Sequence, residues 1–158
     1  HDEGVTDPRS LEELQLDLYP FRSLAREVAA AMMGHVCYPA VDARPAGFSK
    51  RWIGEVLRGE LGFEGLVVSD DLDMTGASPA GQLGDRLEQA FAAGCDLALV
   101  CKPASAQQLL TREADWPGPP RQLMERFRGK PMASLKEQLQ VPEFRAWRSS
   151  LDALMKDQ

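Results

Sequence analysis

The sequence predicts an α/β fold in which parallel strands alternate with crossover helices. Three short apolar runs indicate strands buried on both faces of a sheet: 28–33 (VAAAMM), 65–69 (GLVVS) and 96–101 (DLALVC). Amphipathic segments of helix length separate these runs, and Gly or Pro residues end the segments. This β-α-β-α-β order favours parallel pairing, because a crossover helix returns the chain so that the next strand runs in the same direction.

The first helix is predicted to begin at Ser10, after a polar loop over residues 1–9. Ser10 and Glu13 have the spacing of a capping box, in which each side chain accepts a hydrogen bond from the backbone N–H of the other. We expect the helix to end at Pro20, which cannot donate to the helical ladder. Its apolar face consists of Leu11, Leu14 and Leu18.

The run 28–33 is followed by a loop rich in Pro and Gly, which contains Pro39, Pro45 and Gly47. Ser49 is a candidate N-cap for the next helix, and Gly62 is its stop. The apolar face of this helix consists of Ile53, Val56, Leu57 and Leu61.

The third helix is predicted after a loop through Gly76, Pro79 and Gly81, and Gly94 ends it. Its inward face consists of Leu83, Leu87, Ala90 and Phe91. Beyond Lys102 the periodicity is lost, residues 114–120 (ADWPGPP) form a breaker-rich link, and 142–157 can form a terminal amphipathic helix.

Composition excludes several classes of protein. The 158 residues carry a net charge of −6, whereas a nucleic-acid-binding domain would show a basic face. No apolar run approaches the roughly 20 residues of a membrane span, and no signal peptide is recognisable at the start. The three cysteines lie in apolar segments and are expected to be reduced core thiols of a cytoplasmic protein. With two histidines, neither in zinc-ligand spacing, we expect no metal and no other cofactor.

Polar residues at the carboxyl ends of the predicted strands are the candidates for chemistry, because this edge of a parallel sheet faces the ligand. His35, the pair Asp70 and Asp71, and Lys102 occupy such positions. The alternative for His35 is a hydrogen bond to a neighbouring loop, and for Lys102 a solvated or salt-bridged position on the surface. Asp70 follows a rigid apolar strand directly, which suits a nucleophile, although either acid of the pair could instead cap the following turn. Asp96 begins its strand and lies at the opposite edge, where a structural role is expected.

The pattern by itself leaves two architectures open. A complete (β/α)8 barrel needs eight strand–helix units and about 250 residues. The chain is therefore either a small open sheet or the later portion of a barrel.

Three segments resemble the β-N-acetylglucosaminidases of glycoside hydrolase family 3. GELGFEGLVVSDDLDMTGA (59–77) is similar to the family's nucleophile segment, MMGHVCYPAVDARPAGFSKRW (32–52) to the preceding strand and loop, and AFAAGCDLALVC (90–101) to the final barrel strand. The resemblance covers residues 1–130 and implies the C-terminal portion of a TIM (β/α)8 barrel. Residues 131–158 are then a tail whose helix packs on the barrel.

Carried over to this sequence, the resemblance makes Asp70 the nucleophile of a retaining glycosidase, which forms a covalent glycosyl-enzyme. Asp71 becomes a supporting acid, and His35 and Met74 become substrate-binding residues near the sugar.

The resemblance also implies that His1 is the general acid/base. In the family this group is a His on a loop, eight residues before an Arg that precedes a Ser-Leu-Glu helix start, and His1 stands eight residues before Arg9. A histidine with an ordinary pKa of about 6.5 can donate a proton and then activate water near neutral pH. The family's orienting Asp and Ser are absent here, and the alternative is that His1 is a tag remnant or an arbitrary chain start.

The implied function is that of a cytoplasmic β-N-acetylhexosaminidase which removes terminal β-linked N-acetylglucosamine from peptidoglycan-derived muropeptides, in peptidoglycan recycling. The family's upstream Lys-His-Phe-Pro-Gly-His-Gly loop and earlier strands are absent from this chain. The implied partners are therefore the substrate and the missing N-terminal half of the barrel, with neither nucleic acid nor membrane involved.

Two other classes compete with this interpretation. A catalytically incomplete scaffold stays open. A receiver-like phospho-switch fits poorly, because its phosphorylated Asp ends a strand that follows the acidic pair, whereas Asp96 begins one. Within the same family a β-glucosidase is disfavoured, because those enzymes place Trp after the nucleophile, where Asp71 stands.

The architecture yields the first prediction. The three apolar runs should be adjacent parallel strands, with Asp70 at a carboxyl end. A helix over 65–69, or antiparallel pairing of 65–69 with 96–101, would contradict it.

Overall fold

The computed structural model describes residues 4–111, 118, 121–128, 134, 137 and 140–156. The chain forms two compact units, His1–Phe127 and Arg128–Gln158. The second unit contains the helix α6 (Pro142–Lys156), close to the predicted 142–157. That this helix packs on the barrel, and that the barrel part ends at residue 130, stay predictions.

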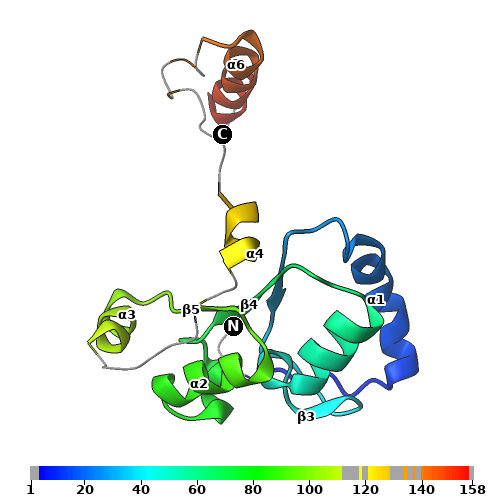
Figure 1. Cartoon of the computed structure of the whole chain (residues 1–158). Coiled ribbons are helices and arrows are strands. Elements are labelled where there is room, and N and C mark those ends of the chain that lie inside the picture. The colour runs from blue at the N-terminus through cyan, green and yellow to red at the C-terminus, as the bar shows by residue number, and fades with distance from the viewer. Residues whose placement is uncertain are drawn as a thin grey trace. The chain divides into compact units, whose positions relative to one another are not determined.

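A three-stranded parallel sheet forms the centre of the first unit. It consists of β1 (Ala30–Met33), β4 (Leu66–Asp71) and β5 (Leu97–Leu99), in the order β1-β4-β5 (Figure 1). Both pairings of β4 are parallel, with Met32 opposite Val68 and Val68 opposite Leu97. The predicted α/β fold with adjacent parallel strands is therefore confirmed, and Asp70 and Asp71 are the last residues of the central strand.

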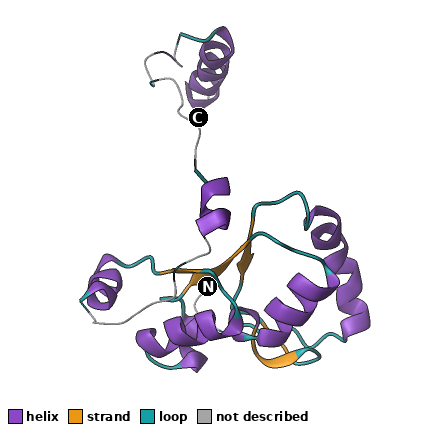
Figure 2. Cartoon of the chain, in the orientation of Figure 1, coloured by secondary structure: helices purple, strands orange, loops and turns teal. Residues whose placement is uncertain are grey.

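Helices connect these strands as predicted. The structure has α1 (Leu11–Leu24), the π-helix η2 (Arg51–Glu60), α2 (Leu83–Ala93), α3 (Pro103–Leu110), α4 (Arg121–Arg126), and the 3-10 helices η1 (Ala46–Phe48) and η3 (Thr75–Ala80). Figure 2 shows η2 and α2 on the same side of the sheet. A core of side chains from β4, η1, η2 and α2 fills the space between these elements; it includes Phe48, Ile53, Val67, Leu87 and Ala90.

The predicted helix termini are formed by the expected contacts. Ser10 and Glu13 make the capping box, with Ser10 N–H donating to Glu13 Oε2 at 2.8 Å and Glu13 N–H to Ser10 Oγ at 3.3 Å. Ser49 Oγ accepts from Trp52 N–H at 3.1 Å at the start of η2. Gly94 ends α2 with a φ of 116°, a left-handed conformation that favours glycine.

The expected end of the first helix at Pro20 is wrong, because α1 continues to Leu24. Pro20 removes only the donor to the carbonyl of Leu16, and water can reach that carbonyl because Leu16 is 81% exposed. Beyond the proline, Ser23 Oγ donates to the carbonyl of Tyr19 at 3.0 Å.

Part of the expected loop after β1 is an antiparallel hairpin of β2 (Cys37–Tyr38) and β3 (Asp42–Pro45). Thr6 also forms a parallel bridge with Cys37, so the segment before α1 pairs with β2 of this hairpin. The prolines that argued for a loop lie at Pro39, in the turn, and at Pro45, the last residue of β3, where a missing N–H costs little.

Two further expectations are corrected. The chain does not lose regularity after Lys102, because Pro103 occupies the first turn of α3, where proline is favoured. The first apolar run is not buried on both faces: Met32 is 59% exposed. Within the described residues β1 pairs only with β4, so its other edge is open.

The amino-terminal edge of the sheet is held by one ion pair. Asp96 Oδ2 accepts from Arg58 Nη2 at 2.9 Å and from the backbone N–H of Val67 at 2.8 Å. Arg58 also donates through Nη1 to the carbonyl of Gly65 at 3.2 Å. The pair therefore joins the end of η2 to the starts of β4 and β5, which is the structural role expected of Asp96.

Replacing Asp96 with Ala should lower the free energy of unfolding of the 158-residue chain by about 2 kcal/mol, because a half-buried guanidinium and a backbone N–H lose a charged acceptor. Urea denaturation would measure the loss. Glu88→Ala is the matched control, since Glu88 is exposed and makes no described hydrogen bond or ion pair, and it should stay within about 0.5 kcal/mol. Equal midpoints for the two variants would contradict the assignment.

Candidate active site

Most of the predicted site residues lie at one edge of the sheet. Asp70 and Asp71 end the central strand, His35 lies two residues beyond β1, and Met74 lies in the turn that follows β4. Lys102 follows β5 as the N-cap of α3 and is exposed. The parallel sheet brings these residues together because its carboxyl ends share an edge. His1 lies outside the described residues.

Asp70 combines a fixed backbone with a largely free carboxylate. Its side chain is half-buried, and its Oδ1 accepts from the N–H of Asp71 at 2.8 Å. Among the described residues, nothing donates to Oδ2. The hydroxyl of the fully buried Ser69 donates to the carbonyl of Asp70 at 2.8 Å and accepts from the N–H of Leu99 at 3.0 Å. Ser69 thus connects the backbone at Asp70 to β5. The Oδ2 atom of Asp70 is available for chemistry.

The neighbouring carboxylates accept hydrogen bonds from the chain that follows β4 and β5. Asp71 Oδ1 accepts from the N–H groups of Asp73 and Cys101, both at 3.0 Å. Asp73 accepts from Lys102 N–H at 3.0 Å through Oδ2 and from Ser105 Oγ at 2.7 Å through Oδ1. Asp71 and Asp73 therefore hold the connection between β5 and α3. Asp70 differs from Asp71 and Asp73, because its carboxylate makes no described hydrogen bond to the connection between β5 and α3.

The cysteines do not supply a competing nucleophile. Desolvation raises the pKa of the buried Cys95 thiol to about 12. Desolvation and then the charge of Asp71 also raise the pKa of the Cys101 thiol, so it stays protonated and weakly nucleophilic. The three cysteines are free, as predicted, but Cys101 is exposed and Cys37 is half-buried, so only Cys95 is a core thiol. Cys101 lies two residues beyond the end of β5, at the carboxyl edge of the sheet.

His35 is buried beneath this edge, with 6% of its surface exposed. Its Nε2 lies 3.0 Å from the carbonyl oxygen of Asp71, and its ring stacks on Phe48 with centroids 5.3 Å apart. The structure thus connects His35 with the end of β4 through the backbone. The alternative for His35, a hydrogen bond to a neighbouring segment, is what the structure contains, although the sequence did not identify Asp71, 36 residues away, as the partner. The predicted contact of His35 with a sugar stays a prediction, as does that of Met74.

The segment that follows residues 1–3 is anchored to the hairpin. Asp7 N–H donates to the carbonyl of Cys37 at 2.8 Å, and Cys37 N–H donates to that of Val5 at 2.9 Å. The Arg9 guanidinium contacts the carboxylates of Asp7 at 2.7 Å and Asp17 at 2.6 Å. The hydrogen bonds from Arg9 hold the pKa of the Asp7 carboxyl below its usual range. This anchor holds the described part of the predicted loop over residues 1–9.

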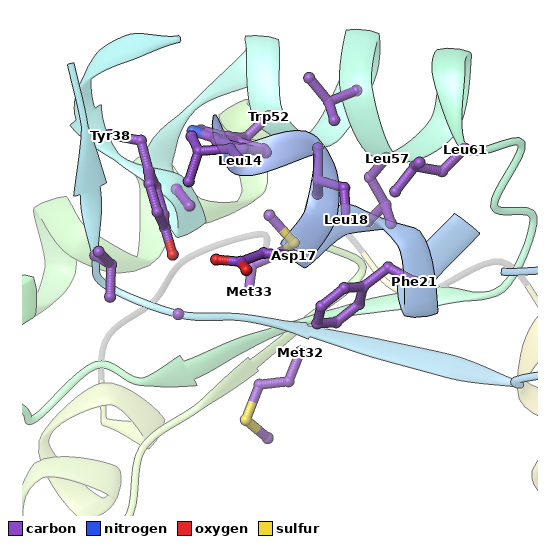
Figure 3. Close-up of a pocket in the computed structure, with 14 residues that line it drawn as sticks. Leu14, Asp17, Leu18, Phe21, Met32, Met33, Tyr38, Trp52, Leu57 and Leu61 are labelled. Carbon is purple, nitrogen blue, oxygen red and sulfur yellow. The ribbon is translucent and has the colours of Figure 1, made fainter. Parts of the chain in front are cut away.

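An apolar cavity of about 260 Å³ lies between α1, β1 and η2, away from the acidic edge. Figure 3 shows side chains of α1, β1 and η2 around it, among them Leu18, Met33 and Leu57. None of Asp70, His35 and Met74 lines the cavity, so it is separate from the candidate site.

The described part of the chain contains neither a cluster of metal ligands nor a membrane-spanning helix. There, no three residues among His, Cys, Asp and Glu are grouped as metal ligands. None of its helices is both long enough and apolar enough to cross a membrane.

Known proteins that are similar to this chain in sequence and fold are glycosidases. Residues 1–115 match the family described as glycosyl hydrolase family 3 N terminal domain. The chain is 47% identical over 150 residues to a beta-hexosaminidase from Pseudomonas aeruginosa, an alignment that covers 94% of this chain and 44% of that protein. The chain therefore spans less than half the length of the curated relatives it matches.

Two solved structures show the same fold at substantial identity. Native NagZ from Neisseria gonorrhoeae superposes with a TM-score of 0.74 at 35% identity, over 92% of this chain and 42% of that one. A glycoside hydrolase family 3 beta-N-acetylglucosaminidase from Paenibacillus sp. str. FPU-7 gives a TM-score of 0.58 at 44% identity, over 62% of this chain and 20% of that one.

Asp71→Ala should increase amide hydrogen exchange at Cys101 by about tenfold or more, because that N–H loses its described acceptor. Asp70→Ala is the matched control, since its carboxylate accepts only from Asp71 N–H within the described residues. Exchange measured by NMR on the 158-residue chain would test this. The division of roles fails if Asp70→Ala has the larger effect at Cys101.

Proposed function

Because this chain belongs to glycosyl hydrolase family 3, we propose that it carries the catalytic nucleophile, Asp70, of a β-N-acetylglucosaminidase. Its parallel sheet is accordingly part of a TIM (β/α)8 barrel and not a small open sheet. Family membership also removes the receiver-like interpretation.

The free carboxylate oxygen of Asp70 is the observation that supports this role. A nucleophile at the carboxyl end of a barrel strand must face the substrate with an oxygen that no protein group occupies. Asp70 Oδ2 fulfils this requirement. Asp71 Oδ2 also has no donor among the described residues, but Asp71 Oδ1 accepts two backbone N–H groups, so that carboxylate holds the connection after β5. Asp71, implied to be a supporting acid, supports the site through this structural role.

The proposed reaction is a double displacement that retains the anomeric configuration. An oxygen of Asp70 bonds to the anomeric carbon as the bond to the leaving-group oxygen breaks, and a general acid gives that oxygen a proton. The conjugate base then takes a proton from water, whose oxygen displaces Asp70 from the sugar. We propose His1 for this acid/base role, on the register that places it eight residues before Arg9.

We propose terminal β-linked N-acetylglucosamine as the group removed. The names of the relatives, beta-hexosaminidase and beta-N-acetylglucosaminidase, support this sugar. Muropeptides as the substrate and the cytoplasm as the location rest on the sequence resemblance. His35 and Met74 were expected to contact the sugar; Met74 is the better placed, since it is half-exposed whereas His35 is buried.

We further propose that the N-terminal part of a barrel completes this site. The open edge of β1 and exposed apolar side chains beside it support this partner: Met32, Phe21 and Leu24 are each more than half exposed. A preceding strand, joined through α1 by a right-handed crossover, would lie along that edge and cover such side chains. The alternative, a catalytically silent scaffold, predicts that completion restores no activity.

Asp70→Ala should reduce turnover by on the order of 10³-fold or more, because a nucleophile acts only along the reaction path. The assay protein is the 158-residue chain fused behind the N-terminal part of the Pseudomonas aeruginosa relative that the alignment leaves unmatched. An aryl β-N-acetylglucosaminide reports turnover, and the unfolding midpoint should hardly change. If Asp71→Ala abolishes turnover and Asp70→Ala does not, the assignment within the pair is wrong.

The 158-residue chain alone should show little or no turnover of the same substrate, and the fusion protein should show it. The chain supplies the proposed nucleophile but few of the contacts that hold a sugar, and a loosely held acid loses much of its advantage. A fluorogenic N-acetylglucosaminide would compare the two proteins at equal concentration. Turnover by the isolated monomer close to that of the fusion would contradict the need for the N-terminal part, and an inactive fusion would favour the scaffold.

A further inference from the structure

We propose that His35 is a positioning residue which orients the nucleophile through the backbone of Asp71. The inference rests on the proposed role of Asp70 and extends the site to a side chain that does not face the substrate. It begins from a buried hydrogen bond between the ends of two neighbouring strands.

Asp71 links His35 to the carboxylate of Asp70 through its two backbone groups. Its carbonyl oxygen lies 3.0 Å from His35 Nε2, and its N–H donates to Asp70 Oδ1 at 2.8 Å. Because the carbonyl can only accept, Nε2 carries the hydrogen and donates it. A change in the direction of the Asp71 carbonyl alters the backbone at that residue and moves the N–H that holds Asp70.

The same carbonyl is also the acceptor for the following turn. Met74 N–H donates to it at 3.1 Å, so the turn after the strand and the end of β1 meet at one oxygen atom. Removing the His35 donor leaves only the local bond within the turn. The backbone at Asp71 then loses its side-chain connection to the end of β1, while Ser69 still connects Asp70 to β5.

Close packing around His35 holds its ring in the orientation that donates to the Asp71 carbonyl. The ring stacks on the buried Phe48 at an interplanar angle of 11°. A Cβ atom at Gly76 would lie 3.0 Å from the Cβ of His35, and one at Gly47 would lie 3.6 Å from its Nδ1. Such close packing leaves little room for another rotamer.

The other ring nitrogen, Nδ1, indicates that the hydrogen bond at Nε2 is the reason for a histidine at this position. Nδ1 is buried and has no hydrogen-bond partner among the described residues. A buried polar atom without a partner costs free energy that an apolar ring would avoid. Phe at this position would keep the stacking and remove that cost, so the donor at Nε2 distinguishes His35 from an aromatic core residue.

Three substitutions separate the donor from the stacking. His35→Phe keeps an aromatic ring on Phe48 and removes the donor. His35→Gln loses the ring but carries an amide nitrogen four bonds from Cα, at the reach of Nε2. His35→Asn loses the ring and carries its amide nitrogen one bond nearer the backbone, at the reach of Nδ1.

In the fusion protein, His35→Phe and His35→Asn should lower kcat by about 10- to 100-fold, the cost of a misplaced reacting group. His35→Gln should stay within about fivefold of the unsubstituted protein, while KM and inhibition by N-acetylglucosamine change by less than about threefold. The midpoint of thermal unfolding should place the three variants in a different order from kcat, with His35→Phe the most stable. A kcat for His35→Phe equal to that of the unsubstituted protein, with His35→Gln impaired, would overturn the proposal.

A second site tests the same contact without altering His35. Gly76→Ala should displace the ring and lower kcat in the manner of His35→Phe. Gly54→Ala is the matched control, because a Cβ there meets nothing within 4 Å, and its kcat should be unchanged. Equal kcat values for the two glycine variants would count against the proposal.

Hydrogen exchange in the 158-residue chain separates this proposal from the proposed function. The amide of Met74 shares its acceptor with His35, so we expect its exchange to change in His35→Phe and His35→Asn but not in His35→Gln. Unchanged exchange in all three variants would overturn the positioning role. An inactive fusion would instead contradict the role of Asp70, while the exchange result would still decide whether His35 holds the Asp71 carbonyl.

Discussion

Parallel pairing of β4 with β1 on one side and β5 on the other determines where the candidate site of this protein lies. The two pairings place the last residues of three strands at one edge, with Asp70 and Asp71 in the middle. The long-range polar contacts of the candidate site then follow from what the flanking strands offer at that edge. β1 is followed by the His35 ring, and β5 is followed by the N–H groups of Cys101 and Lys102.

The acidic run after β4 shows how one short segment can serve two purposes. Adjacent residues of a strand point to opposite faces of a sheet, so neighbouring carboxylates meet different surroundings. Asp71 meets the connection after β5, and its carboxylate becomes a backbone acceptor. Asp70 keeps an oxygen free, and its main chain is fixed by Ser69 and by Asp71. Rigid backbone around a free carboxylate is the arrangement that a nucleophile requires, because geometry set before the reaction need not be reached during it.

The two edges of the sheet differ in what stabilises them. At the amino edge, the pair of Arg58 and Asp96 connects a helix with two strands through Asp96 Oδ2. At the carboxyl edge, the backbone is held by buried hydroxyl, imidazole and carboxylate groups. This asymmetry is typical of barrel enzymes, in which one face carries stability and the other carries function. The free outer edge of β1 and the apolar side chains beside it fit the same architecture.

The sequence by itself determined the features that depend on neighbours along the chain. Apolar runs of strand length, the capping box at Ser10, the cap at Ser49 and the stop at Gly94 are local patterns, and the structure contains all of them. The same patterns, with the family resemblance, were the basis for proposing Asp70 as the nucleophile. The expected helix end at Pro20 was wrong, because the rule that proline ends a helix takes no account of solvent exposure. The hairpin was missed because its strands are short and flanked by proline.

Only the tertiary structure decided what each polar group of the site touches. Asp71 and Cys101 are 30 residues apart, and His35 and Asp71 are 36 apart. Their contacts come from strand order and register, and nothing in the intervening residues encodes them as a spacing. The sequence could therefore name the acids, while the separate role of each, and the buried position of His35, required the fold that brings distant backbone groups within hydrogen-bonding distance.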